Sequence, residues 1–418
     1  MPRVLLLIPT TSYQTADFLA AADQLDVDVV VGSDEPSVLA QAAGTSLTVD
    51  FRHPDRGSAQ IREFACHTPI DAIVPVDEVT TAVAASAADT LNLRHNSPES
   101  VLKAGNKLRL RECLRDAHVP TPEFVPLDID ADVSDVARAV SYPCVLKPLT
   151  LSASRGVIRA DGHNSFVVSF QRIRDLLSGL DRDGEAARTI LVEQYIPGAE
   201  VALEGLVADG ALRVLALFDK PDPLEGPFFP ETIYVTPSRL TTDEQARIAE
   251  TTQGAISAMG LRDGPVHAEL RLGETGPVII EVAARSIGGL CSRVLRFGAG
   301  VSLEELILRH ALRLPIESLE REARPAGVMM LPVPGERPGR LHRVDGIDAA
   351  RLVPGIVEVT LSIPIGERVV PLPEGNRYLG FIFARGDTPG AVERALKRAF
   401  ARIEFAVSED QACGGSTA

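Results

Sequence analysis

Short apolar runs separated by polar and amphipathic stretches organise the first 95 residues of the chain. Four such runs, each closing in glycine, proline or an acidic residue, cover residues 4–8, 27–31, 47–51 and 72–76. Apolar runs of roughly four to eight residues bounded by turn signals are typical of buried strands, and the amphipathic stretches between them indicate helices. The pattern predicts a layer of buried parallel strands in βαβ units over residues 1–95.

Glu78 follows the last of these runs directly. Ligands of open parallel sheets gather at the carboxyl ends of the strands, so Glu78 is expected to face a crevice and to contact a substrate there. The alternative is an acid on a solvated loop.

The middle of the chain reads as two mixed regions. Ser97, followed by proline and glutamate, predicts a helix N-cap, and a second helix is expected through residues 109–117. A small strand-and-helix unit follows, with strands at residues 144–147 and 189–193 and a helix at 166–177. A larger mixed region continues from about residue 201.

From about residue 326 the pattern changes to short strands, at residues 328–331, 357–362 and 379–384, closed by a helix at 389–400. This block predicts an α+β cap, and the small polar tail 413–418 is expected to fray. The whole chain is therefore expected to be multidomain, α/β and α+β, with boundaries at residues 1–95, 96–200, 201–325 and 326–418.

Composition narrows the class of protein. With 418 residues, 45% hydrophobic and 24% charged, the chain is globular, and its formal charge of −15 opposes a nucleic-acid partner. The apolar opening is too short for a signal segment or a membrane span. The five cysteines lack CxxC spacing, which argues for a reducing, cytoplasmic compartment and against a zinc site: Cys66, Cys113, Cys144, Cys291 and Cys413.

Lysine is rare, so its placement is informative. Only five of the 42 basic residues are lysines, at positions 103, 107, 147, 220 and 397. Lys147 ends an apolar strand and precedes a small-residue loop that contains Ser152, Ser154 and Gly156. Such a loop lets backbone N–H groups approach phosphate oxygens while the lysine adds a point charge. An ordinary hairpin turn is the alternative.

A second stretch, residues 190–204, ends a strand in Glu193, passes through a short apolar hinge and places Glu200 seven residues later. A hinge of this kind can offer backbone groups to an adenine edge and a carboxylate to ribose hydroxyls. A plain strand, turn and strand is the competing interpretation.

The sharpest pattern is a predicted hairpin whose first strand carries Glu269 and whose second strand ends at Glu281 after an apolar run. Two carboxylates at this depth repel each other unless a cation lies between them, and hard oxygen ligands suit Mg²⁺. Solvated strand ends are the alternative. His267, two residues before Glu269, is expected to be a core residue or to support the site.

In their order and spacing these segments resemble the ATP-grasp superfamily of carboxylate-amine ligases, over about residues 1–325. The resemblance implies an ATP-grasp fold with an N-terminal pre-ATP-grasp layer and a C-terminal cap, and it implies ATP and Mg²⁺, or Mn²⁺, as cofactors. By this resemblance Lys107 and Lys147 contact phosphates, and the loop of Ser152, Ser154 and Gly156 closes over them. Glu193 with the backbone at Tyr195 and Ile196 would hold adenine, Glu200 the ribose, and Glu269 with Glu281 the metal.

One departure from the sequence pattern of most ATP-grasp ligases, just after Glu281, points to one branch of the superfamily. Ala283 stands two residues after Glu281, where many members carry asparagine, and Ala283 cannot bind a metal. The resulting Glu-x-Ala-Ala-Arg form resembles the L-amino-acid ligases, which make dipeptides. That resemblance implies that Arg285 grips the acyl phosphate or a substrate carboxylate, and that Gly288 and Gly289 line the substrate pocket.

The stretch 227–237 matches a segment that lines the amino-acid site in this branch. Glu231 would then pair with a substrate ammonium and Tyr234 would fix its orientation, whereas the alternative is that Phe228 and Phe229 only pack the subdomain.

The resemblance implies an ADP-forming ligase that joins a carboxylate, expected to be an amino acid, to an amine through an acyl phosphate. The expected partners are these small molecules, with neither nucleic acid nor membrane, and a homodimer is left open. Two alternatives remain: a ligase of another product class, such as purine-pathway or D-alanine-type enzymes, and a regulatory ATP-binding protein without turnover. The Walker-type phosphate-binding motif is absent from the sequence.

Overall fold

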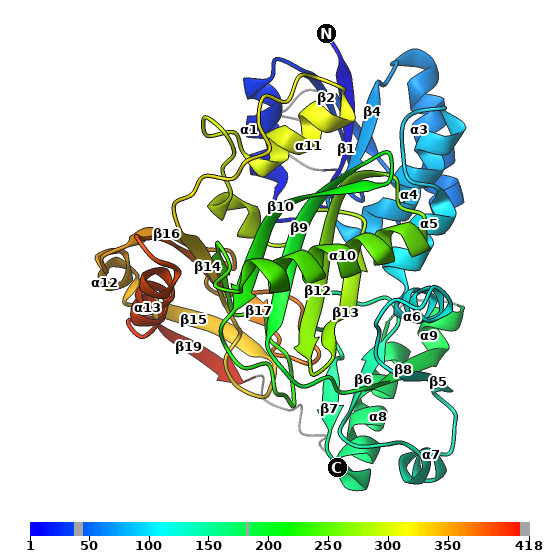
Figure 1. Cartoon of the computed structure of the whole chain (residues 1–418), viewed down its shortest axis with the longest axis vertical. Helices are drawn as coiled ribbons and strands as arrows, with labels where there is room; N and C mark the ends of the chain where they lie inside the picture. The colour runs from blue at the N-terminus through cyan, green and yellow to red at the C-terminus, as the bar shows by residue number, and fades with distance from the viewer. Residues whose placement is uncertain (37–44, 181–183, 410–418) are drawn as a thin grey trace, which may run out of the picture. The chain divides into compact units, whose positions relative to one another are not determined.

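The computed structural model describes residues 1–36, 45–180 and 184–409, and the predicted fraying of residues 413–418 falls outside them. The chain forms two compact units (Figure 1). Unit 1 contains Met1–Thr121, Val201–Phe218 and Leu240–Ala323, and unit 2 contains Pro122–Glu200, Asp219–Arg239 and Arg324–Ala418. Among the described residues, no helix has both the length and the apolar character needed to cross a membrane.

Unit 1 begins with a four-stranded parallel sheet in the order β3-β2-β1-β4, as the apolar runs predict. Its strands are β1 (Arg3–Leu7), β2 (Asp28–Ser33), β3 (Thr45–Thr48) and β4 (Ala72–Pro75). Helices α3 (Pro54–His67) and α4 (Glu78–Thr90) bury Ile61 and Val83 against Leu5 and Leu7 of β1. Helix α1 (Thr15–Gln24) packs against α11 (Leu303–Ala311).

The third strand differs from its prediction. It occupies Thr45–Thr48, not residues 47–51, and as an edge strand it is mostly exposed where a buried strand was expected. The reason is local, because the Asp50 carboxylate accepts hydrogen bonds from the backbone N–H groups of Arg52 and His53. These bonds favour a turn at Asp50 over an extended strand.

The remaining strands of unit 1 are neighbours in one sheet, in the order β13-β12-β9-β10. These strands are β9 (Glu200–Ala208), β10 (Ala211–Lys220), β12 (Asp263–Gly273) and β13 (Gly276–Ala283); Glu200 and the last two residues of β10 belong to unit 2. Helix α10 (Thr242–Met259) lies along this sheet in Figure 1, and α5 (Pro98–Gly105) and α6 (Lys107–Asp116) also pack on β13. A 3-10 helix at Cys291–Val294 follows β13 in the chain.

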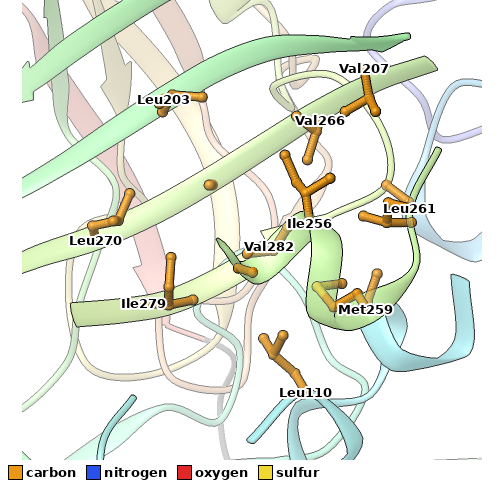
Figure 2. Packing of buried hydrophobic residues seen from close by; sticks show 14 of the residues in the cluster. Leu110, Leu203, Val207, Ile256, Met259, Leu261, Val266, Leu270, Ile279 and Val282 are labelled. Atoms are coloured by element: carbon orange, nitrogen blue, oxygen red, sulfur yellow. The ribbon is translucent and has the colours of Figure 1, made fainter. Parts of the chain in front are cut away.

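The core behind this sheet is apolar and closely packed. Figure 2 shows Ile256 of α10 and Leu110 of α6 on the same side of the sheet as Ile279 and Val282 of β13. All four side chains are buried. Helix α10 is fixed at its start by a capping box, in which Thr241 accepts a hydrogen bond from Glu244 N–H and the Glu244 carboxylate accepts one from Thr241 N–H. Packed helices on one face therefore hold the strands that carry Glu269 and Glu281.

Unit 2 contains a small antiparallel sheet in the order β5-β8-β6-β7. The strands are β5 (Phe124–Asp128), β6 (Cys144–Pro148), β7 (Ile158–Ala160) and β8 (Thr189–Gln194), with helices α7 (Val133–Ala139), α8 (His163–Ser178) and α9 (Glu185–Arg188). Phe166, Phe170 and Ile173 of α8 recur at helical spacing and pack against Leu146 and Ile190 of the sheet.

The C-terminal part of unit 2 has a mixed α+β architecture, as predicted. Antiparallel strands run in the order β11-β14-β18-β16, and a second sheet has the order β17-β15-β19. Val392, Leu396 and Ala399 of α13 bury one helical face against the first sheet. The elements are β11 (Ile233–Thr236), β14 (Ala326–Leu331), β15 (Gly339–Asp345), α12 (Ile347–Arg351), β16 (Ile356–Leu361), β17 (Arg368–Val369), β18 (Gly380–Arg385), α13 (Pro389–Phe400) and β19 (Glu404–Glu409).

The α8 helix offers a direct test of this packing. Phe170 is 1% exposed, whereas Val168 on the same helix is 63% exposed. Phe170→Ala removes a ring from the core of the small sheet and is expected to lower the free energy of unfolding by about 3–5 kcal/mol. Val168→Ala should change it by no more than about 0.5 kcal/mol. Chemical denaturation of both variants measures the difference, and equal effects would contradict this placement of α8.

Candidate active site

The β12–β13 hairpin brings Glu269 and Glu281 together. They are directly opposite partners in the antiparallel ladder, and the register shifts between Glu269 and Leu270. Like charges placed directly opposite destabilise a sheet unless something compensates them. Lys107 supplies one positive charge, because its Nζ lies 3.9 Å from Oε2 of Glu281. The predicted metal pair and the first predicted phosphate lysine therefore meet on unit 1.

Helix α6 is tied to the hairpin one turn after Lys107. Arg111, which is buried, donates a hydrogen bond from Nη2 to the carbonyl of Ile280, 2.6 Å away and next to Glu281 in the chain. The helix start is capped by Asn106, whose side chain accepts from the N–H groups of Leu108 and Arg109. Lys107 is thus positioned by its helix against β13.

A second compensating group lies on β12. His267 Nε2 is 3.7 Å from Oε1 of Glu269, and its Nδ1 is 3.1 Å from Oε2 of the fully buried Glu204 on β9. Burial alone would lower the pKa of His267, but the hydrogen bonds to Glu204 and Glu269 outweigh it and raise the pKa to about 9. The raised pKa favours the imidazolium form, which puts a positive charge beside Glu269, while burial raises the pKa of the Glu204 carboxyl as well.

Arg285 and Glu78 form a separate pair in unit 1. Arg285 Nε lies 3.2 Å from Oε2 of Glu78, the first residue of α4. Burial raises the pKa of Glu78, and the nearby guanidinium opposes this shift. Both carboxylate oxygens of Glu78 are buried and accept no hydrogen bond from any described residue. A buried carboxylate whose oxygens accept no hydrogen bond within the protein can accept hydrogen bonds from a ligand.

The segment after Arg285 is built from small residues. A Cβ placed on Gly288 would meet only Arg285 Nη1, at 3.9 Å, and Gly289 adopts a positive φ of 64°. Ile287 holds the segment in place, since its N–H donates to Glu204 and its carbonyl accepts from Gln14. A small side chain would therefore have room at position 288 beside the guanidinium.

In unit 2, Lys147 and Glu193 face each other on neighbouring strands β6 and β8. Nζ of Lys147 lies 2.6 Å from Oε2 of Glu193, and the two side chains are only 6% and 3% exposed. Charges this deeply buried persist only when they are paired. The residues predicted for phosphate and adenine are therefore brought together as one ion pair.

The loop after β6 has an unusual backbone. Ala153 and Ser154 adopt positive φ values of 55° and 56°, and Gly156 follows at 73°. Non-glycine residues rarely adopt this region, and such strain concentrates at ligand-binding segments. A Cβ on Gly156 would lie 2.7 Å from Cγ of Pro148, so glycine is required for the loop to fold back on the strand that carries Lys147. Ser152 is exposed at the start of the loop.

The hinge beyond Glu193 leaves Tyr195 and Ile196 partly exposed, and the guanidinium carbon of Arg159 lies 4.2 Å from the Tyr195 ring centroid. Glu200, at the start of β9, is buried and forms an ion pair with Lys220. The same lysine Nζ lies 2.7 Å from Oε2 of Glu231. Lys220 therefore bridges the acids predicted for ribose and for the substrate ammonium.

Tyr234 joins this cluster, as its hydroxyl donates to Oε2 of Glu231 at 2.7 Å and its ring centroid lies 5.2 Å from Lys220 Nζ. The two residues named from the sequence for the amino-acid site are therefore in contact with each other. Phe228 and Phe229 pack in unit 2, as the alternative interpretation expected, and the substrate role of Glu231 and Tyr234 stays a prediction.

Sequence reasoning missed three of these partners: Lys220, Glu204 and Arg111. Lys220 carried a signal, because it is one of only five lysines and stands two residues after the apolar run that ends at Phe218. Glu204 and Arg111 gave none, since each is recognised only through contacts with residues at least 63 positions away.

Comparison with known proteins identifies the domains of the chain. An ATP-grasp domain model matches residues 140–294, an ATP-grasp N-terminal domain model matches 19–95, and the model "L-amino acid ligase C-terminal domain 2" matches 332–408. The protein y4rH of Sinorhizobium fredii is 25% identical over 98% of this chain and 84% of its own length. An alanine–anticapsin ligase of Bacillus subtilis is 25% identical over 72% of this chain and 67% of its own length.

Among solved structures, an L-amino acid ligase from Bacillus licheniformis superposes with a TM-score of 0.81 and 24% identity, covering 98% of this chain and 99% of that one. This likeness establishes the fold. Taken with the three matched domains, it identifies the chain as an ATP-grasp carboxylate-amine ligase near the L-amino-acid ligase branch.

Proposed function

We propose that this ligase joins the carboxylate of one amino acid to the amine of a second through an acyl phosphate, releasing ADP and phosphate. The observation that carries the proposal is the Glu269–Glu281 pair facing across one ladder, with Lys107 beside it. The names of relatives support the substrate class, since they include alanine–anticapsin ligase and L-arginine-specific L-amino acid ligase.

The residues present fit a magnesium ion. Two carboxylates at directly opposite ladder positions offer hard oxygen ligands, and Glu281 and Glu269 are 31% and 16% exposed, so both are accessible. Ala283, buried at 2% exposure, contributes no ligand atom. When bound, Mg²⁺ neutralises charge on phosphate oxygens and helps to align the transferring group. The donor set suits Mn²⁺ as well as Mg²⁺.

For ATP we propose that Lys147 and the 152–156 loop bind phosphates, and that Lys107 adds a further charge. The Lys147–Glu193 pair keeps the lysine ammonium oriented within a dry environment, where a charge-assisted contact is strong. Glu193 and the partly exposed hinge at Tyr195 and Ile196 would hold adenine, and Glu200 the ribose. Positioning and electrostatics are the main contributions that a protein makes to phosphoryl transfer.

The first chemical step forms a bond between a carboxylate oxygen of the acyl substrate and the γ-phosphorus, and breaks the bond to the bridging oxygen of ADP. Arg285 would stabilise the acyl phosphate, with Gly288 and Gly289 leaving space for the acyl side chain. Glu78 would bind the ammonium group of the amino acid that supplies the carboxylate, because the buried oxygens of Glu78 accept no hydrogen bond from a described residue.

In the second step the amine nitrogen attacks the acyl carbonyl, phosphate leaves, and the nitrogen loses a proton. Glu231 is the candidate for contacting the amine. Glu231 already forms an ion pair with Lys220 and accepts a hydrogen bond from the Tyr234 hydroxyl, so the orientation of its carboxylate is fixed before substrate binds. Such preorganisation lowers the entropic cost of reaching the reactive arrangement.

The metal assignment is tested by charge-neutral substitutions on one hairpin. Glu269→Gln or Glu281→Gln should lower amino-acid-dependent ADP release by about a hundredfold or more, because metal anchoring contributes several kcal/mol to the transition state. Glu274→Gln is the matched control, since Glu274 is an exposed acid in the turn of the same hairpin. Initial rates at increasing Mg²⁺ measure the effect. Near-normal rates in Glu281→Gln would place the metal elsewhere.

The reaction itself is tested with a panel of amino acids and amines. We expect ADP release that depends on an amino acid, and hydroxamate formation when hydroxylamine replaces the amine. Nucleotide chromatography and the iron(III) hydroxamate assay measure the two products. Release of AMP and pyrophosphate would refute the acyl-phosphate mechanism, and ADP release only with purine-pathway carboxylates would refute the substrate class.

A further inference from the structure

Unit 2 contains a cavity of about 280 Å³ that the proposed mechanism does not use. Its walls come from the 152–156 loop, the stretch before β11, residues 332–335 after β14, and residues 370–378, which we call the C-terminal segment. The lining is mainly apolar and includes Phe228, Pro230, Val333, Pro371, Leu372 and Tyr378. Ligand sites are typically concave and apolar with a few polar groups, and this volume suits a molecule smaller than a typical drug.

The C-terminal segment is bound to the 152–156 loop. Gly156 N–H donates to the carbonyl of Pro373 at 2.7 Å, and Arg155 Nε donates to the carbonyl of Glu374 at 2.7 Å. The Glu374 carboxylate pairs with Arg172 of α8, with Nη2 to Oε2 at 2.9 Å. The cavity is therefore fixed beside the loop to which phosphate binding is assigned.

The polar members of the lining are Asn376 and Arg377, and both are exposed. Among the described residues no carboxylate forms an ion pair with Arg377. A guanidinium presents donors in a planar fork that matches a carboxylate. A cavity with apolar walls and one such cation is complementary to a small molecule that has an apolar side chain and an anionic group.

Of the participants in the proposed reaction, the amine donor keeps an anionic group throughout, if it is an amino acid. The acyl substrate loses its free carboxylate when it is phosphorylated, and Arg285 is assigned to it. The amine donor, if it is an amino acid, keeps a free carboxylate in both substrate and product. An amino acid that donates its amine therefore needs a cation to pair with its carboxylate, whereas a simple amine does not.

We propose that the cavity binds the amine-donating amino acid, with Arg377 paired to its carboxylate and Phe228, Pro230 and Leu372 against its side chain. This inference rests on the proposed function and extends it to the second substrate. It also gives the C-terminal domain a role in the reaction, because two of the four named residues belong to that domain.

The test compares Arg377→Ala with wild type, using L-leucine and L-leucinamide as amine donors at saturating ATP and acyl substrate. Wild type should prefer leucine, and the variant should show a KM for leucine raised about tenfold, with the preference over leucinamide lost. The KM values for ATP and for the acyl substrate should stay unchanged. Arg394→Ala is the control, because Arg394 is an exposed arginine of α13 outside the cavity lining.

Hydroxylamine separates failure of this inference from failure of the proposed function. It carries neither a carboxylate nor a side chain, so the hydroxamate rate should be equal in wild type and Arg377→Ala. Equal hydroxamate rates with an unchanged KM for leucine would refute the cavity assignment alone. Absence of hydroxamate in the wild type would refute the proposed function and the cavity's role together.

A second substitution tests the apolar wall. Val333→Phe adds a ring to the cavity lining and should raise the KM for leucine much more than the KM for glycine as amine donor. An equal change for both donors would contradict side-chain binding in the cavity.

Discussion

The candidate site depends on one pairing, that of Glu269 with Glu281 across the β12–β13 ladder. Antiparallel register places these carboxylates side by side, so their repulsion has to be offset by positive charge. Lys107 and protonated His267 provide it within the protein, and each is itself anchored, through Arg111 on Ile280 and through Glu204. The apolar core under the hairpin supplies the rigidity that keeps this arrangement in place.

In unit 2, too, carboxylates lie beside cations that offset their charge, and here the cations are lysines. Lys147 with Glu193, and Lys220 with Glu200, are buried ion pairs, and the partly buried Glu231 shares Lys220, so each of these acids has a cation beside it. Such clusters add little net stability, since burial of the charges costs about as much as their attraction returns. In the roles proposed for them, they contribute orientation, because fixed ammonium and carboxylate groups would meet a nucleotide or an amino acid without prior rearrangement.

Much of the fold was predictable because its signals are local. Apolar runs marked the parallel strands, Ser97 with Pro98 marked the start of α5, and the helices expected at residues 166–177 and 389–400 lie where α8 and α13 are found. The third strand was misplaced because the apolar run at residues 47–51 extends into a turn, which the Asp50 carboxylate stabilises by accepting from the N–H groups of Arg52 and His53. The hairpin acids were found because their order in the sequence follows a known pattern.

The partners of these residues could not be predicted, because they depend on contacts between distant segments. Glu204 lies 63 residues from His267, and Pro373 lies more than 200 residues from the loop glycine that it contacts. Sequence also gave no indication that the cap would border a cavity beside the 152–156 loop, as that requires four separate chain segments to meet.

The central claim is that the acyl carboxylate itself attacks the γ-phosphorus of ATP. Isotope transfer tests it most directly: an amino acid labelled with ¹⁸O in its carboxylate is turned over as acyl substrate, and the released phosphate is analysed by mass spectrometry. The account predicts one ¹⁸O atom in each phosphate released, because the oxygen that forms the acyl phosphate leaves with phosphorus. Unlabelled phosphate, or label recovered in AMP, would contradict it.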